Sequence, residues 1–296
     1  MIFLDPKSDM VFKKLFGSIT HKNILISFLN SALERADGEK IVDVVINDPH
    51  NIPETPGLSK TSIVDVRCTD EAKNHYIVEM QVITQSDYAA RAQYYSSLAL
   101  SRQLASKEKY DKLMPVIFVG ILDFKLFKSD HYISHHLILD NQTHEHELKH
   151  FAFHFIELKK FNKTLEEITT TLDKWIYFFK NAVTLQKVPS SLKDSALEEA
   201  FNILEQGNWS IRELEAYDQY LDAIRSSASQ LDTAKEIGMA QGMAQGITQG
   251  ITQGITQGIL QAKLEIAQNL LKTHDTQSIA KITGLSLQEI ETLKKN

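Results

Sequence analysis

Asp65, Glu79 and Gln81 stand where apolar side chains are usual, in a segment whose alternation predicts a β-hairpin. Residues 62–82, "SIVDVRCTDEAKNHYIVEMQV", alternate apolar and polar side chains on both sides of a turn expected near Ala72. Because successive side chains of a strand point to opposite faces, Glu79 and Gln81 share one face of the second strand. The same turn sets Asp65 directly opposite Glu79, with their Cβ atoms about 5 Å apart.

Facing carboxylates of this kind suit a divalent metal ion. Two like charges repel each other, and burying them without a cation costs several kcal/mol, so an ion between Asp65 and Glu79 would be stabilising. Oxygen ligands with positions open to water fit Mg²⁺ or Mn²⁺, whose usual partner is phosphate. Gln81 points the same way and can hydrogen-bond a water molecule or a phosphate oxygen. The hairpin therefore predicts metal-dependent phosphate chemistry.

The same residues also permit a simpler interpretation. Asp65 can pair with Arg67 or Arg91, and Glu79 with a lysine, as ordinary ion pairs on a solvated face of a sheet. The spacing of an Asp, a Glu and a Gln in two strands is weakly specific by itself. Both interpretations stay open on these residues alone.

The segments before the hairpin predict a helix and a strand that support it. Residues 7–36 carry apolar side chains at helical spacing, with Asp5 as the cap and Pro6 in the first helical position. Gly17 is expected to divide this helix in two. Residues 41–48 are rich in β-branched side chains and predict a short strand.

The segments after the hairpin predict an α/β domain followed by helices. Residues 86–105 have the Ala, Leu and Arg content of a helix, and residues 113–124 form the continuous apolar run of a strand covered on both faces. Residues 135–140 and 150–158 predict further strands. From residue 164 onward the pattern is helical.

A four-residue repeat follows in residues 238–261, "GMAQGMAQGITQGITQGITQGILQ". In a helix each repeat advances 40° beyond a full turn, so the glycines and the Met or Ile side chains form slanted stripes that a second copy could pair with. A flexible spacer is the other interpretation, because each interior Gly costs roughly 1 kcal/mol relative to Ala. After the repeat, the sequence predicts two short helices, the second with a capping box from Ser286 to Glu289. These helices resemble a helix-turn-helix module. A packed helical cap is the other interpretation.

Composition limits the class of protein and its partners. The chain has 296 residues, a formal net charge of -6 and a single cysteine, Cys68. Apolar runs stay below the roughly 18 residues of a membrane span, and the first residues lack a signal peptide pattern, so we expect a cytoplasmic protein that is not in a membrane. Contact with nucleic acid would need a local basic surface. Residues 13–23, with Lys13, are one candidate, although a solvated helix face has the same composition.

Seven histidines between residues 131 and 154 invite a zinc interpretation. No cysteine joins them, and an exposed strand face would explain several through its period of two. They are His131, His135, His136, His144, His146, His150 and His154.

Five stretches in a fixed order resemble a known family. They are "DPKSDMVFKKLFG", "SIVDVRC", "YIVEMQV", "RAQYYSSLAL" and "MPVIFVGILDF". In this order they resemble the Rpn family of recombination-promoting nucleases and putative transposases, a branch of the PD-(D/E)XK nuclease superfamily. The resemblance implies an α/β restriction-endonuclease-like fold, with a mixed central sheet flanked by helices, and an α-helical C-terminal extension. We expect four parts: a nuclease-like domain in 1–187, a helical extension in 188–232, the repeat helix in 233–272 and a helical tail in 273–296.

The resemblance also assigns roles to particular residues. Asp65 and Glu79 match the two motif acids, and Gln81 stands in the place of the superfamily lysine. The implied ligands of Mg²⁺ or Mn²⁺ are Asp65, Glu79, the carbonyl of Met80, and Asp9 on the first helix. The residues expected to contact DNA are Arg91, Tyr95 and Lys13.

The implied activity is a metal-dependent DNA endonuclease linked to recombination or mobile elements. An amide in place of a lysine brings no positive charge, so weak or tightly regulated cleavage is compatible with the pattern. The alternative is a catalytically weak or inactive scaffold that binds DNA or a protein and is regulated through its repeat tail. Homodimers, or association with a separately made C-terminal fragment, would use that repeat.

Overall fold

The computed structural model describes residues 2–47 and 64–294. It forms two compact units, Met1–Arg225 and Ser226–Asn296. Residues 48, 62 and 63, which belong to expected strands, lie outside the described part. The expected division into four parts remains a prediction.

The first unit is built on one mixed six-stranded sheet in the order β1-β2-β3-β4-β6-β5. The first three strands pair antiparallel, β4 and β6 run parallel to β3, and β5 is an antiparallel edge strand. The strands are β1 Val44–Asn47, β2 Val66–Asp70, β3 His75–Gln81, β4 Val116–Leu122, β5 Ile133–Leu137 and β6 Phe151–Glu157. The predicted α/β fold with a mixed sheet is thereby confirmed.

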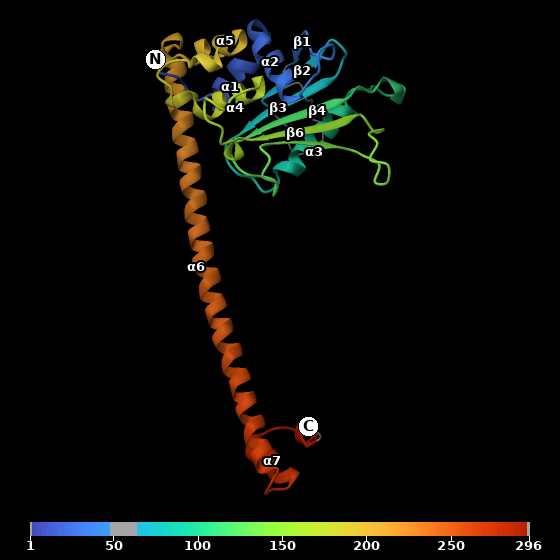
Figure 1. Ribbon diagram of the computed structural model, residues 1–296, viewed down its shortest axis with the longest axis vertical. Coiled ribbons are helices and arrows are strands. Elements are labelled where there is room, and N and C mark those ends of the chain that lie inside the picture. Colours follow the sequence, from blue (N-terminus) through green and yellow to red (C-terminus); the bar gives the residue numbers. More distant parts are fainter. Residues whose placement is uncertain (1, 48–63, 295–296) are drawn as a thin grey trace. The chain divides into compact units, whose positions relative to one another are not determined.

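Helices cover both faces of this sheet (Figure 1). One face carries α1 Asp9–Phe16, α2 Lys22–Ala32, α4 Thr171–Asn181 and α5 Ser195–Leu204, and the other carries α3 Tyr88–Ser101. Short 3-10 turns link these elements at Ile19–His21, Tyr110–Lys112, Leu158–Lys160, Ala182–Thr184, Ser190–Leu192 and Gln206–Asn208. Because side chains alternate along β3, Tyr76 and Val78 enter the core under the four helices, whereas Ile77 enters the core under α3.

The first helix begins later than the sequence predicts. Its first residue is Asp9 and its N-cap is Ser8, whereas Asp5 was the expected cap and Pro6 the expected first residue. The carboxylate of Asp5 accepts a hydrogen bond from the Lys7 amide at 2.9 Å, a local turn that competes with helix initiation. The expected division of the helix at Gly17 is confirmed.

The central strand β4 is buried along its whole length, as its apolar run predicts. Gly120 lies where α3 approaches the sheet most closely. A Cβ atom at this position would lie 2.9 Å from the Tyr88 hydroxyl and 3.0 Å from the ring of Phe155. A glycine is therefore required for the contact between α3 and the sheet.

We expect the substitution Gly120→Ala to lower the free energy of unfolding by about 1–3 kcal/mol, because the added methyl group overpacks this contact. Urea denaturation followed by circular dichroism measures the change. Gly207→Ala is the matched control, since no atom lies within 4 Å of a Cβ atom there. Equal stability of both variants would contradict the prediction.

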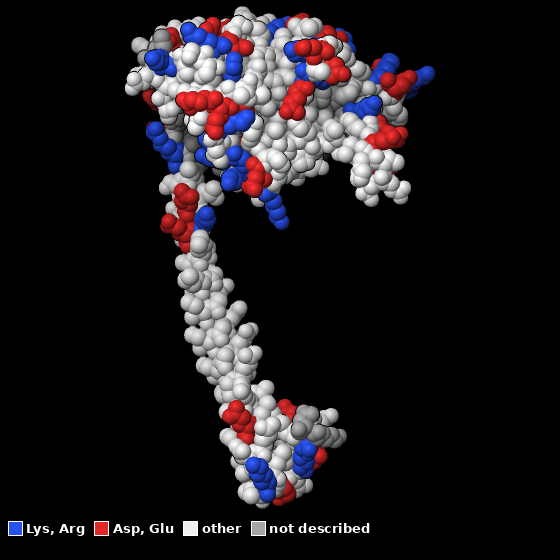
Figure 2. Space-filling model, in the orientation of Figure 1, with Lys and Arg blue, Asp and Glu red and all other residues white. Residues whose placement is uncertain are grey.

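The long helix α6, Ile211–Leu270, begins in the first unit and continues into the second. The repeat is helical throughout, in agreement with one of its two interpretations. Residues 237–262 contain no charged side chain, and Figure 2 shows this band. Within the described part of the chain, no helix combines the length and hydropathy that a bilayer span requires.

The second unit ends in two short helices, α7 Thr276–Thr283 and α8 Leu287–Leu293. They pack on the end of α6 through a small core that includes Ala267, Ile279 and Ile290. The predicted capping box at the start of α8 is present.

Candidate active site

The hairpin has the predicted register. Val66 of β2 pairs with Val78 of β3, so one residue outward Asp65 is set opposite Glu79. Asp65 lies in a bend immediately before β2 and is half-buried. Glu79 lies within β3, where only 5% of its surface is exposed. The neighbouring residue Ile77 faces α3, so Glu79 and Gln81 also belong to the α3 side of the sheet.

Asp65 is fixed against the main chain of β3. Its Oδ2 atom accepts a hydrogen bond from the Met80 amide at 2.8 Å. Burial raises the pKa of Asp65 to about 6, the Met80 hydrogen bond opposes this rise, and the nearby Asp9 carboxylate adds to it. Asp65 is therefore close to both the main chain of Met80 and the carboxylate of Asp9, and a metal-binding role for these groups stays a prediction.

Glu79 is the most strongly perturbed carboxyl group of the site. Burial raises its pKa to about 8, the negative charge of Asp65 adds to the rise, and Arg91 partly offsets it. Without a bound cation, Glu79 therefore holds a proton at neutral pH. A divalent cation would relieve both the cost of burying the charge of Glu79 and its repulsion from Asp65.

Asp9 and Lys13 lie one helical turn apart on α1 and form an ion pair at 2.7 Å. Both side chains are partly exposed, so Lys13 remains accessible to solvent. The hydroxyl of Tyr220, in the first part of α6, lies against the Asp9 amide. The structure thus places Asp9 beside Asp65, but with Lys13 as its closest partner.

Gln81 is held at both ends of its amide. Its Oε1 atom accepts a hydrogen bond from Arg91 Nη2 at 2.6 Å, and its Nε2 atom donates to the carbonyl of Ile83 at 3.0 Å. The sequence led us to expect an amide that orients water. That role remains a prediction, and the contact with Arg91 is an unforeseen feature of the site.

Arg91 and Tyr95 lie on α3 beside the acids. The guanidinium carbon of Arg91 is 4.9 Å from the ring centre of Tyr88 and 6.0 Å from that of Tyr95. Arg91 Nη2 approaches Glu79 Oε2 to 3.9 Å. The simpler interpretation of the hairpin paired Arg91 with Asp65 and Glu79 with a lysine, so this loose contact between Arg91 and Glu79 is not one of the ion pairs that it named.

Sequence reasoning missed a charged cluster at the carboxyl end of β4. The amide of Asp123 donates to the carbonyl of Gln81 at 2.9 Å, and the Asp123 carboxylate binds Lys7 at 2.9 Å and Lys159 at 3.3 Å. These residues are far apart in sequence and carry no shared motif. The pairing of β3 with β4 could have identified Asp123, because parallel strands bring their carboxyl ends together.

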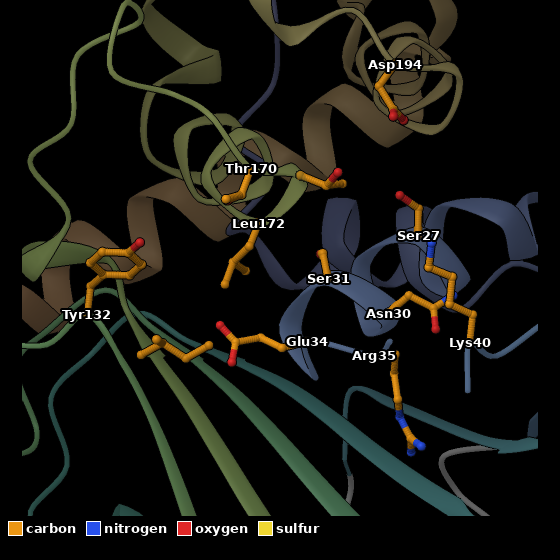
Figure 3. A pocket seen from close by; sticks show the side chains of 12 residues that line it. Ser27, Asn30, Ser31, Glu34, Arg35, Lys40, Tyr132, Thr170, Leu172 and Asp194 are labelled. Carbon is orange, nitrogen blue, oxygen red and sulfur yellow. The ribbon is translucent and has the colours of Figure 1, made fainter. Parts of the chain in front are cut away.

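A separate cavity of about 560 Å³ lies on the four-helix side of the sheet, where residues of α2 face the start of α4 (Figure 3). No predicted site residue lines it. Its lining is Ser27, Asn30, Ser31, Glu34, Arg35, Lys40, Tyr132, Ile133, Thr170, Thr171, Leu172 and Asp194. The Asn30 amide is already committed to both main-chain groups of Ile41. The cavity is thus separate from the site around Asp65 and Glu79.

The histidines do not assemble a zinc site in the described residues. His135 and His154 face each other across β5 and β6, with 2.5 Å between their Nδ1 atoms, and burial lowers the pKa of His154 to about 3. In residues 2–47 and 64–294, no three His, Cys, Asp or Glu side chains are grouped so that they could hold a metal ion. A metal ion at the acid pair would therefore depend on main-chain oxygens and water as further ligands.

Comparison with known proteins gives one match. A family model described as "PD-(D/E)XK nuclease family transposase" matches residues 6–234, which include the whole sheet and both acids. No curated protein and no solved structure matches the chain. The resemblance drawn from the five sequence stretches is confirmed by this match.

Proposed function

The chain belongs to the PD-(D/E)XK nuclease family transposases, and we propose that it is a metal-dependent DNA endonuclease acting in recombination or in a mobile element. The family gives it a nuclease- or transposase-related role. One observation carries the finer proposal: Glu79 is buried directly opposite Asp65, with a pKa raised by burial and by that second acid. A divalent cation would stabilise the ionised form of such a pair.

The oxygen atoms around this pair suit Mg²⁺ or Mn²⁺. The proposed ligands are Asp65, Glu79 and the carbonyl of Met80, completed by water. Asp9, the fourth predicted ligand, lies beside Asp65, but the three carboxyl groups are not grouped closely enough to hold one ion together. When bound, the ion would supply positive charge to the scissile phosphate and acidify the attacking water. The hydrogen bond from the Met80 amide holds the Asp65 carboxylate in place, and the strand holds Glu79.

Cationic and aromatic side chains around the acids provide contacts for DNA. Arg91 and Tyr95 project from α3, and Lys13 projects from α1. The net charge of -6 argues against broad attraction to nucleic acid, so these local contacts would set the position of the phosphate backbone.

Removal of divalent metal should abolish cleavage and its return should restore it. Purified protein is incubated with supercoiled plasmid in Mg²⁺, in Mn²⁺ and in EDTA, and nicked and linear products are quantified on gels. We expect products only with metal. Equal cleavage in EDTA would contradict metal dependence, and the absence of products in all three conditions would contradict nuclease activity.

A second candidate is a scaffold that binds DNA or protein without cleaving. The contact of Arg91 with Glu79 favours it, because an internal cation beside the acid weakens the need for a metal ion. Isothermal titration calorimetry separates the two functions. DNA binding without any heat of Mn²⁺ binding would favour the scaffold.

We also propose that the repeat helix pairs with a second copy of the chain. Its large apolar side chains are exposed at a spacing of four residues: Met239, Met243, Ile247, Ile251, Ile255 and Ile259. The glycines preceding them have open space where a Cβ atom would lie. A ridge of large side chains beside a groove of glycines at the same spacing is self-complementary.

Charges on the apolar stripe should therefore dissociate the dimer. We expect the double substitution Ile251→Glu and Ile255→Glu to halve the mass measured by light scattering, because it buries like charges in the interface. Gln249→Glu with Gln253→Glu adds the same charge to the opposite side of the helix and should leave the mass unchanged. A wild-type protein that is already monomeric would refute the pairing.

A further inference from the structure

Among the described residues, the cationic side chain that pairs with the buried acid comes from a helix and not from the hairpin. Arg91 projects from α3 and places Nη2 at 3.9 Å from Glu79 Oε2. Its guanidinium lies beside the rings of Tyr88 and Tyr95, so aromatic contacts restrict its orientation. The hairpin residue on the same face, Gln81, is an uncharged amide.

Two glutamines orient this guanidinium. Arg91 Nη2 donates to Gln81 Oε1 at 2.6 Å, and Arg91 Nη1 donates to Gln85 Oε1. Gln81 is itself fixed, because its Nε2 atom donates to the Ile83 carbonyl. The amide of Gln81 therefore has its acceptor aimed at Arg91, and its hydrogen bond to Ile83 holds it in that orientation.

The chemistry of the two acceptors matters. A carboxylate partner would neutralise the guanidinium, whereas a neutral amide orients it and leaves its positive charge in place. A guanidinium has five N–H donors. The Nε donor of Arg91 is buried without a hydrogen-bond partner in the described part of the chain, and each Nη atom donates one of its two N–H groups to a glutamine. The positive charge and the second N–H group of each Nη atom thus remain for a phosphate group.

We propose that Arg91 and Gln81 act as one unit, in which Arg91 is a catalytic residue that contacts the scissile phosphate and Gln81 is the positioning residue that aims it. This inference rests on the proposed nuclease function. Positive charge aimed at a phosphate while its negative charge increases stabilises the transition state more than the bound substrate. Arg91 would supply this positive charge from α3, and Gln81 would hold it in position from β3.

A double-mutant cycle on the cleavage rate tests the unit. We expect Arg91→Ala to lower the single-turnover rate with Mg²⁺ by roughly 100-fold, a typical loss for one electrostatic group. Gln81→Ala should lower it less, and the double variant should be no slower than Arg91→Ala alone, because Gln81 acts through Arg91. Gln81→Lys in the Arg91→Ala protein should regain at least tenfold, by returning a cation to the same face.

A second cycle has a readout independent of activity. The same single and double variants are unfolded in urea in EDTA, and a real hydrogen bond between the two side chains predicts losses of stability that are not additive. Gln93→Ala is the matched control, because the side chain of Gln93 lies exposed on the same helix and donates to the carbonyl of Ala89, away from the acids. This substitution should leave both the cleavage rate and the free energy of unfolding in EDTA unchanged.

The outcomes separate this inference from the function on which it rests. Rate losses that multiply in the double variant, or a wild-type rate in Arg91→Ala, would overturn the unit while cleavage by the wild-type protein stands. Additive losses of stability would overturn the pairing itself. A wild-type protein that does not cleave DNA with Mg²⁺ or Mn²⁺ would overturn the function and the unit together.

Discussion

Replacing Asp65 by Asn or Glu79 by Gln should reduce the rate of DNA cleavage at least ~100-fold. Each substitution keeps the shape of the side chain and removes one negative charge from the pair that would hold the metal ion. The Asn side chain can still accept the hydrogen bond from the Met80 amide, so the bend before β2 is preserved. Single-turnover cleavage of a labelled duplex with Mg²⁺ measures the rate.

The control for this experiment is Asp37→Asn, which removes the same charge from a nearly fully exposed side chain outside the site. It should cleave like the wild-type protein. If the Asp65 and Glu79 variants also retained the wild-type rate, the two acids would not form the reaction centre.

Without metal, the Glu79→Gln protein should be more stable than the wild-type protein, by on the order of a few kcal/mol at pH 8. The folded protein raises the pKa of Glu79 from 4.5 to about 8, chiefly through burial. Between these two values the unfolded chain is ionised while the folded chain keeps its proton, so the wild-type protein loses stability as pH rises from about 4.5 to 8. An uncharged amide has no such loss.

The measurement is urea denaturation in EDTA at pH 5 and at pH 8. The advantage of the Glu79→Gln protein should be small at pH 5 and large at pH 8. Added Mn²⁺ should stabilise only the wild-type protein, because an ion that binds the folded state shifts the folding equilibrium. A variant that is less stable at both pH values would show that Glu79 is instead favourably paired.

Local sequence patterns predicted the strands that carry the site and the pairing between them. The alternation in residues 62–82 was sufficient for the register, since a period of two assigns each side chain to a face and the turn fixes the pairing. The uniform apolar run of β4 likewise predicted a strand covered on both faces. The start of α1 was wrong, because the side chain of Asp5 makes a local turn that spacing alone does not reveal.

Contacts between distant segments could not be predicted in this way. The hydrogen bond from Arg91 to Gln81 depends on how α3 packs on the sheet, and the ion pair from Lys7 to Asp123 joins residues far apart in the chain. Glu79 is buried in β3, where it pairs with Gly120 of β4, and this pairing also joins distant segments. Only the assembled layers bring these groups together.

The proton on Glu79 would make metal binding at the site depend on pH. A metal ion and a proton compete for the same carboxyl oxygens, so loading the site at neutral pH amounts to exchanging one cation for another. The protein would take up metal more readily in a slightly alkaline medium than in an acidic one. Acidification would return the proton to Glu79 first and, below a pH of about 6, would protonate Asp65 as well.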